Sequence, residues 1–368
     1  MLGLVLLVIL GAYILGRDGD YRWDIEAPLP LPDVPVDNPM SDVKVELGRR
    51  LFYDTRLSIN DTTSCASCHV QELAFTDGRP RSIGATGATH PRGAMSLVNS
   101  AYASRLTWAN NLIDRLEDQA LTPLLGDNPV EMGMAGREDV IVMMLSNDPV
   151  YSTLMPAAFP NDTNPYSVLN TVRATSAFVR TIISFTSPYD NFLRGDLDAI
   201  DESAKRGMDL FFSERLECFH CHGGFNFTDS TTHANASVDR VGYHNNGLYN
   251  VDGNGAYPAD NTGLYDMTGN RRDMGRFKAP TLRNIVVTAP YMHDGSLATL
   301  DEVIDHYARG GRKLIAGEYI GDGRLSPFKS EFIRGFELDE QERSDLLAFL
   351  NTLTDERVLT DERWSNPH

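Results

Sequence analysis

Cys65-Ala-Ser-Cys68-His69 and Cys218-Phe-His-Cys221-His222 together contain all four cysteines of this 368-residue chain. In each box, two residues separate the thiols and a histidine follows the second thiol directly. This Cys-x-x-Cys-His pattern is typical of c-type haem attachment, in which the thiols add to the haem vinyl groups and the histidine binds iron. A thioredoxin-like dithiol or part of a zinc site would explain the cysteines but not both histidines. The sequence therefore predicts two covalently bound c-type haems.

The segments around the two boxes repeat each other. Gly48-Arg-Arg-Leu-Phe52 precedes the first box and Gly207-Met-Asp-Leu-Phe211 precedes the second. Phe75-Thr-Asp77 follows the first box as Phe227-Thr-Asp229 follows the second. Apolar residues recur at helical spacing over 137–145, 166–185, 300–308 and 339–353, whereas the alternation of a strand is scarce. We therefore predict a mainly α fold with two tandem cytochrome c-like domains, each around one haem.

Four segments are expected along the chain. Residues 1–20 begin with an apolar run that is shorter than the roughly 20 residues a spanning helix needs, which favours a signal peptide or short membrane anchor. Residues 21–39 are rich in proline and predict an extended arm. The N-terminal haem domain would occupy residues 40–200 and the C-terminal haem domain residues 201–360. Haem attachment of this type takes place outside the bacterial cytoplasm, so we expect a periplasmic protein whose leader is cleaved or kept as a tether.

The charge restricts the classes of partner. The chain has 51 acidic and 33 basic residues, which give a formal net charge of −18. Such a surface disfavours nucleic acid and anionic membranes as partners. It is compatible with a partner protein that has a basic or neutral docking face, and equally with a role in solubility alone.

Several strings between about residues 38 and 354 resemble the bacterial di-haem cytochrome c peroxidase/MauG superfamily. The resemblance implies that peroxide reacts at the N-terminal haem and that the C-terminal haem is a low-spin electron-transfer centre. The strings are Phe75-Thr-Asp-Gly78, Pro91-Arg92, Leu116-Glu-Asp-Gln-Ala120, Pro129-Val-Glu-Met132, Phe277-Lys-Ala-Pro-Thr-Leu-Arg-Asn284 and Thr288-Ala-Pro-Tyr-Met-His-Asp-Gly295.

The resemblance also implies the iron ligands. Peroxidases of the family have a second histidine ligand after a Ser-Ile-Gly string, but Ala85 stands there, so His69 would be the only protein ligand of the first haem. We interpret His90, five residues further on, as a loop histidine. For the second haem, His222 would bind opposite Tyr307, which lies fourteen residues after His293, where MauG-like proteins have a tyrosine. The alternatives to Tyr307 are Met292, Met274 and His306.

Further site residues follow from the same resemblance. Glu131 matches the acid–base residue beside the reactive iron, and Gln119 and Pro123 match residues that line the same pocket. Trp108 would bridge the two haems, although a tryptophan that only packs in the core is the alternative. The family also holds a calcium ion, for which Thr288 and Pro290 would supply main-chain oxygens. Gly93 replaces the asparagine that the peroxidases have there.

The favoured function is that of the MauG-like branch, and the strings around residues 85–97 and 106–110 look most like the MbnH-type enzymes. Such enzymes use hydrogen peroxide to form a paired Fe(IV) state, which oxidises a tryptophan on a periplasmic copper-binding partner protein. The alternative is a cytochrome c peroxidase that reduces peroxide with electrons from a small cytochrome c or cupredoxin. A third class, a non-catalytic di-haem electron carrier, would not need Glu131 or an open iron.

Overall fold

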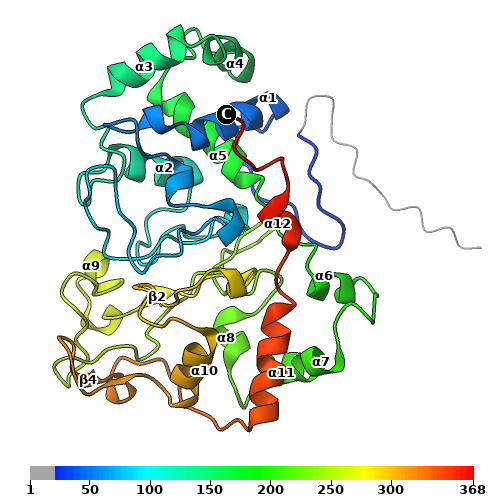
Figure 1. The fold of residues 1–368 in the computed structure, drawn as a ribbon, viewed down its shortest axis with the longest axis vertical. Helices are drawn as coiled ribbons and strands as arrows, with labels where there is room; N and C mark the ends of the chain where they lie inside the picture. Colours follow the sequence, from blue (N-terminus) through cyan, green and yellow to red (C-terminus); the bar gives the residue numbers. More distant parts are fainter. Residues whose placement is uncertain (1–20) are drawn as a thin grey trace, which may run out of the picture.

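The computed structural model describes residues 21–368, so the predicted leader lies outside the described residues. Helices dominate this part of the chain, and the predicted mainly α fold is confirmed. The α-helices are α1 (Asp42–Tyr53), α2 (Leu116–Leu125), α3 (Glu138–Asn147), α4 (Tyr151–Ala158), α5 (Val168–Arg180), α6 (Pro188–Leu193), α7 (Glu202–Phe211), α8 (Cys218–His222), α9 (Tyr265–Thr268), α10 (Leu300–Ala308), α11 (Glu340–Asn351) and α12 (Glu356–Thr360). In Figure 1, α1 to α5 form one half of the elongated molecule, and α7 to α11 form the other.

Shorter elements connect these helices. Seven 3₁₀ turns lie at Thr55–Leu57, Cys65–Ser67, Gln71–Leu73, Ser100–Tyr102, Arg271–Asp273, Ile285–Val287 and Gly323–Leu325. Two small antiparallel pairs are the only named strands among the described residues. In the first, β1 (Tyr243–His244) pairs with β2 (Phe277–Lys278), and in the second, β3 (Lys313–Leu314) pairs with β4 (Gly321–Asp322).

The internal repeat of the sequence reappears as two equivalent helix crossings. Helix α1 packs on α5 in the first half, and α7 packs on α11 in the second. A Cβ atom added to Gly48 of α1 would lie 1.9 Å from the carbonyl oxygen of Ala174 in α5. A Cβ atom added to Gly207 of α7 would lie 1.8 Å from the carbonyl oxygen of Asp345 in α11. Both repeats therefore need glycine at this point because the helix backbones touch.

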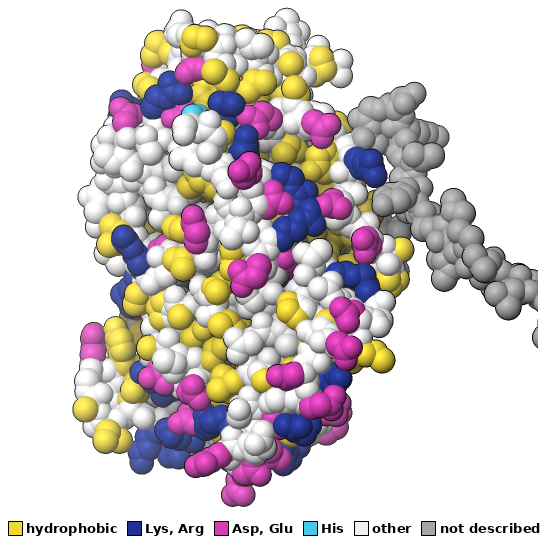
Figure 2. Space-filling view, turned by 45° about the vertical axis from the view of Figure 1, so that its right-hand side comes forward, with side chains coloured by type: hydrophobic (Ala, Val, Ile, Leu, Met, Phe, Trp, Pro, Cys, Tyr) yellow, Lys and Arg dark blue, Asp and Glu magenta, His cyan; other side chains and the backbone are white. Residues whose placement is uncertain are grey.

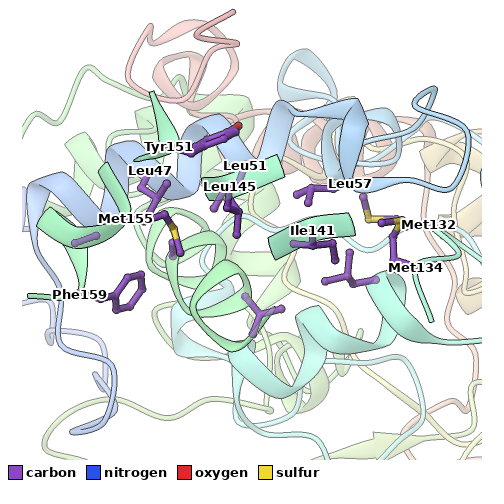
Figure 3. Packing of buried hydrophobic residues seen from close by; sticks show 14 residues of the cluster. Leu47, Leu51, Leu57, Met132, Met134, Ile141, Leu145, Tyr151, Met155 and Phe159 are labelled. Carbon is purple, nitrogen blue, oxygen red and sulfur yellow. The ribbon is translucent and has the colours of Figure 1, made fainter. Parts of the chain in front are cut away.

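Each half has an apolar core of its own. In the first half, α1 contributes Leu47 and Leu51, four residues apart, and Figure 3 shows them beside Ile141 and Leu145 of α3 and Met155 of α4. In the second half, buried aromatic rings dominate the packing between α7 and α11. These rings belong to Tyr189, Phe211, Phe227 and Phe349, with centroid separations of 5.2 to 6.2 Å.

Both ends of the described chain contact residues of the first half. The tail after α11 runs back along the molecule to α1 (Figure 1). There the Tyr53 hydroxyl donates a hydrogen bond to the carbonyl of the buried Trp364 at 2.6 Å. Helix α12, which the sequence analysis assigned to the second domain, contacts the turn Gln71–Leu73 of the first. Residues 21–41 contain no helix or strand, and the Pro30 carbonyl accepts a hydrogen bond from Tyr102.

The surface carries charges of both signs. Figure 2 shows acidic and basic side chains interspersed over one face, without a continuous region of one sign. No helix within residues 21–368 has the length and apolar character needed to cross a membrane.

Candidate active site

One cavity of about 860 Å³ is shared by the two halves of the molecule. Protein interiors are close-packed, with few voids larger than a water molecule, so a space of this size indicates room for a large group. All six of the predicted attachment residues line it: Cys65, Cys68, His69, Cys218, Cys221 and His222. The structure therefore brings the two boxes, which lie about 150 residues apart in the sequence, to one connected site.

The two box histidines are oriented in the same way. His69 donates from Nδ1 to the Phe75 carbonyl at 2.8 Å, and His222 donates from Nδ1 to the Pro280 carbonyl at 3.1 Å. These bonds fix the tautomer and leave Nε2 of each ring as a free ligand atom. Burial lowers the pKa of both imidazoles, which keeps them neutral, as iron ligation requires. Phe75 has a left-handed φ of 60°, and its counterpart Phe227 has 49°.

The geometry also tests the two other uses of a Cys-x-x-Cys pair. The cysteines are unpaired, and burial raises the pKa of the Cys65 and Cys218 thiols to about 12. A reactive dithiol needs the opposite shift. Among the described residues, the one group of three potential metal-binding side chains is Glu214, Glu217 and His220, which includes no cysteine. The boxes therefore fit covalent haem better than a redox dithiol or a zinc site.

Tyr307 of α10 lines the cavity at the end that holds the second box. Of the three alternative ligands, His306 and Met274 do not line it, and His306 Nε2 instead contacts the Asn246 carbonyl at 3.0 Å. Met292 lines the cavity, with its sulfur 3.2 Å from the Asn246 amide nitrogen. Burial raises the pKa of Tyr307 above its usual value, so its phenolate form would need a bound cation such as ferric iron.

The end of the cavity near His69 has the predicted reactive residues. Glu131, Gln119 and Pro123 all line it. Burial raises the pKa of Glu131, and Gln119 Oε1 is buried without a hydrogen-bond partner. Ala85 has no ligand atom in its side chain, and its backbone N–H donates to the Glu131 carbonyl at 2.6 Å. An acid–base side chain and a free acceptor therefore face the space in which a small substrate would react.

Trp108 connects the two halves. Its indole Nε1–H donates to the Gly93 carbonyl at 2.9 Å, and its own carbonyl accepts from the Lys278 amide at 2.8 Å. Trp108 lines the cavity and also packs against the cluster that includes Leu248 and Phe277, so its packing is compatible with the predicted bridging role, which stays a prediction. Lys278 is buried, lines the cavity, and has its pKa lowered to about 8 by burial, which suits an anionic partner such as a haem propionate.

The predicted calcium donors also border this space. Thr288 and Pro290 line the cavity. At Gly93, an added Cβ atom would lie 3.1 Å from the Arg79 carbonyl and 3.3 Å from the Pro80 carbonyl. The asparagine of the peroxidases would therefore be crowded at this position, and the calcium ion remains a prediction.

Comparisons with known proteins agree with this geometry. A family model described as "Di-haem cytochrome c peroxidase" matches residues 42–198. Cytochrome-c peroxidase IdrP1 of Pseudomonas sp. (strain SCT) is 35% identical over 357 residues, covering 91% of this chain and 87% of that protein. Methylamine utilization protein MauG of Methylorubrum extorquens is 34% identical over 322 residues, covering 87% and 80%. The chain belongs to the di-haem cytochrome c peroxidase and MauG family.

A solved structure gives the same result for the fold. A MauG-like protein associated with microbial copper homeostasis is 51% identical and superposes with a TM-score of 0.92, covering 94% of this chain and 99% of that one. As a member of the di-haem family, the protein is a peroxide-dependent oxidoreductase with two c-type haems. The predicted family and the predicted class of enzyme are thus confirmed.

Sequence reasoning missed several side chains at the site of this di-haem enzyme. His244 lines the cavity, and its Nε2 lies 2.6 Å from Asp229. Burial alone would lower the pKa of His244, but the bond to Asp229 helps to raise it to about 10. Asp229 belongs to the repeated Phe-Thr-Asp string, which was a usable signal. His90 was interpreted as a loop histidine, but it lines the cavity with Nε2 3.9 Å from Glu131 Oε1.

Proposed function

We propose that the protein uses hydrogen peroxide to oxidise an aromatic side chain, a tryptophan, on a partner protein. The observation that carries this proposal is Ala85, which leaves His69 as the one ligand-capable side chain predicted for the first iron, with Glu131 and Gln119 beside the open side. The haems, held by the two boxes, would supply the redox chemistry of peroxide reduction. An open metal position can accept substrate without a prior change of ligand.

The protein's part in peroxide cleavage is proton transfer. The Glu131 carboxylate takes the proton from the peroxide oxygen that faces the iron and returns it to the other oxygen, which leaves as water. The free Oε1 atom of Gln119 accepts a hydrogen bond from the peroxide and orients it for this transfer. Both groups need only reach the open end of the cavity, which they line.

The second end of the cavity is suited to holding oxidising charge. We propose Tyr307 as the phenolate ligand opposite His222, because an anionic oxygen ligand stabilises oxidised iron, whereas a thioether favours the reduced metal. We also propose Trp108, which lines the shared cavity, as the easily oxidised ring that connects the two haems. A calcium ion held by the main-chain oxygens of Thr288 and Pro290 belongs to the same proposal.

The nature of the partner is supported by the 51% identical neighbour, which is associated with copper homeostasis. We infer a periplasmic, copper-binding partner protein with an oxidisable tryptophan. The second candidate, reduction of peroxide with electrons from a small cytochrome c or cupredoxin, is favoured by the relatives named cytochrome-c peroxidase and by Met292 on the cavity wall.

The resting ferric holoenzyme tests the proposal. Electron paramagnetic resonance should show one high-spin and one low-spin haem, and peroxide should react before any reductant is added. Mass spectrometry of the candidate partner should then show oxygen added at a tryptophan. Two low-spin haems that must be reduced before they react, or rapid peroxide-driven turnover of reduced cytochrome c, would favour the second candidate instead.

A further inference from the structure

We propose that His90 is the positioning and proton-relay residue that connects Glu131 with solvent. This inference rests on the acid–base role proposed above for Glu131. The reduction H₂O₂ + 2e⁻ + 2H⁺ → 2H₂O consumes two protons where peroxide binds. Its two electrons come through the haems from the partner protein, which becomes oxidised. The protons that the partner loses are therefore released away from the site where peroxide binds. The open end of the cavity therefore needs its own proton supply from water.

His90 and Glu131 are placed for such a supply. His90 Nε2 lies 3.9 Å from Glu131 Oε1, and both side chains line the cavity. The His90 side chain is 30% exposed and the Glu131 side chain 33%, which includes their exposure to the cavity. Thr86, Gly87 and Thr89 of the segment that carries His90 are exposed, so this segment reaches the surface of the molecule. The separation exceeds a direct hydrogen bond, but one bridging water or a small rotation spans it. Catalytic hydrogen bonds are often long before substrate is bound.

The backbone holds His90 in this position. Residues Ser82–Arg92 form a hairpin in which the His90 N–H donates to the Ser82 carbonyl at 2.8 Å. The hairpin contacts the backbone of the segment that carries Glu131. A Cβ atom added to Gly84 would lie only 2.0 Å from the Val130 carbonyl oxygen. The bond from Ala85 N–H to the Glu131 carbonyl joins the same two segments. His90 and Glu131 are therefore parts of one fixed unit.

The other ring nitrogen of His90, Nδ1, has both a hydrogen-bond donor and an acceptor nearby, so either neutral tautomer of the ring is satisfied. His90 Nδ1 lies 3.1 Å from the Arg92 amide nitrogen and 3.2 Å from the Arg92 carbonyl oxygen. When Nδ1 accepts from the amide, Nε2 carries hydrogen and donates towards the carboxylate. When Nδ1 donates to the carbonyl, Nε2 accepts the proton of a neutral Glu131. Through Nε2 and the bridging water, the imidazole can thus either donate a proton to Glu131 or accept one from it.

The surrounding charges keep the ring neutral. Burial, followed by the Arg92 guanidinium, lowers the pKa of His90, while Asp77 from the preceding loop acts in the opposite direction. Burial raises the pKa of the facing Glu131. The two affinities for a proton therefore approach each other, which favours rapid exchange between the groups.

The experiment uses the haem-loaded enzyme and cyanide as a probe. Cyanide arrives as neutral HCN and binds ferric iron as the anion, so its proton must pass to the pocket without any turnover. We expect His90→Leu and the polar variant His90→Gln each to slow cyanide association and the return of the peroxide-oxidised enzyme to rest by tenfold or more. His233→Gln is the matched control, since His233 is a loop histidine outside the cavity lining. Added neutral imidazole should restore the rates of His90→Leu, which a purely structural role would not allow.

Two outcomes separate this inference from the function on which it rests. If Glu131→Gln slows both reactions while both His90 variants keep wild-type rates, the relay is wrong and the role of Glu131 stands. If Glu131→Gln also keeps wild-type rates, the acid–base assignment fails and the relay fails with it.

Discussion

Glu131→Gln is the sharpest test of the proposed peroxide chemistry because the structure isolates the charge of this side chain. No hydrogen bond from another described residue reaches the Glu131 carboxylate, and among the described residues the one basic side chain within 4.0 Å of it is His90, at 3.9 Å. The loop is held by backbone bonds instead, from Ala85 N–H to the Glu131 carbonyl and from Met132 N–H to the Pro123 carbonyl. Glutamine keeps the size of the side chain, so the substitution should remove a proton acceptor and leave the cavity intact.

The expected magnitude follows from the role. A positioned general acid–base group contributes about 10²–10⁴ in rate, which at about 1.4 kcal/mol per tenfold corresponds to about 3–5 kcal/mol of barrier. We therefore expect peroxide activation to slow by about 10²–10⁴ in Glu131→Gln. Because burial raises the pKa of Glu131, the carboxylate is lost at a higher pH than for an exposed glutamate. The wild-type rate should accordingly fall as the pH decreases through this raised pKa. The rate of the variant should not show this fall.

Stopped-flow mixing of the ferric holoenzyme with excess peroxide measures this rate directly. Glu46→Gln is the matched control, because the Glu46 side chain is 35% exposed against 33% for Glu131 but belongs to α1 and does not line the cavity. The control should react at the wild-type rate. A rate for Glu131→Gln within threefold of wild type, or equal slowing in the control, would refute the reasoning.

Three further substitutions test other parts of the site. Tyr307→His should leave both haems attached but abolish oxidation of the partner, as followed by mass spectrometry, and unchanged oxidation would exclude Tyr307 as the decisive ligand. Trp108→Phe should keep the first reaction with peroxide but slow partner oxidation at least tenfold, and equal rates would reduce Trp108 to a packing role. Asp190→Asn should lower the free energy of unfolding by about 3–5 kcal/mol, because Asp190 and Arg283 form a bidentate pair of 2.9 Å bonds with side chains only 4% and 1% exposed. Denaturant titration of the holoenzyme checks this value, and a loss below about 1 kcal/mol would mean that the pair is solvated.

The haem boxes and the repeat could be predicted because their signals are local. A box needs its cysteines and histidine within five residues, and the glycines at 48 and 207 report a close helix contact that only glycine allows. The cavity then brings together most of the residues that the family resemblance selected, although Ala85 is not among those that line it. Spacing alone chose Tyr307 over its neighbour His306, and the structure agrees to the extent that only Tyr307 of the two lines the cavity.

The features that sequence reasoning missed depend on contacts between distant segments. His244 lies in β1, within a segment rich in glycine and asparagine that the sequence did not predict as a strand, and only the fold brings it to Asp229. The contact of α12 with the first half could not be predicted from the sequence. Apolar periodicity shows that a helix has a buried face but not which element covers that face. The sequence shows that His90 lies in a loop, whereas its proximity to Glu131 depends on how the hairpin packs against residues 130 and 131.

We propose that the two haem sites differ in the residues that would face the box histidines across the cavity rather than in the boxes themselves. His69 and His222 each donate from Nδ1 to a backbone carbonyl, so the proximal sides present nearly the same ligand to iron. At the end of the cavity near the first box, His90 of the hairpin lies 3.9 Å from Glu131, and we propose that Ala85 leaves the iron there without a second ligand. At the other end, α10 contributes Tyr307 to the wall of the cavity. On this proposal, the two copies of the repeat bind haem in the same way but differ in reactivity, because one has the methyl side chain of Ala85 and the other the phenol of Tyr307. If this is correct, Ala85→His should make the first haem six-coordinate and low-spin and suppress its direct reaction with peroxide, while the signature of the second haem stays unchanged.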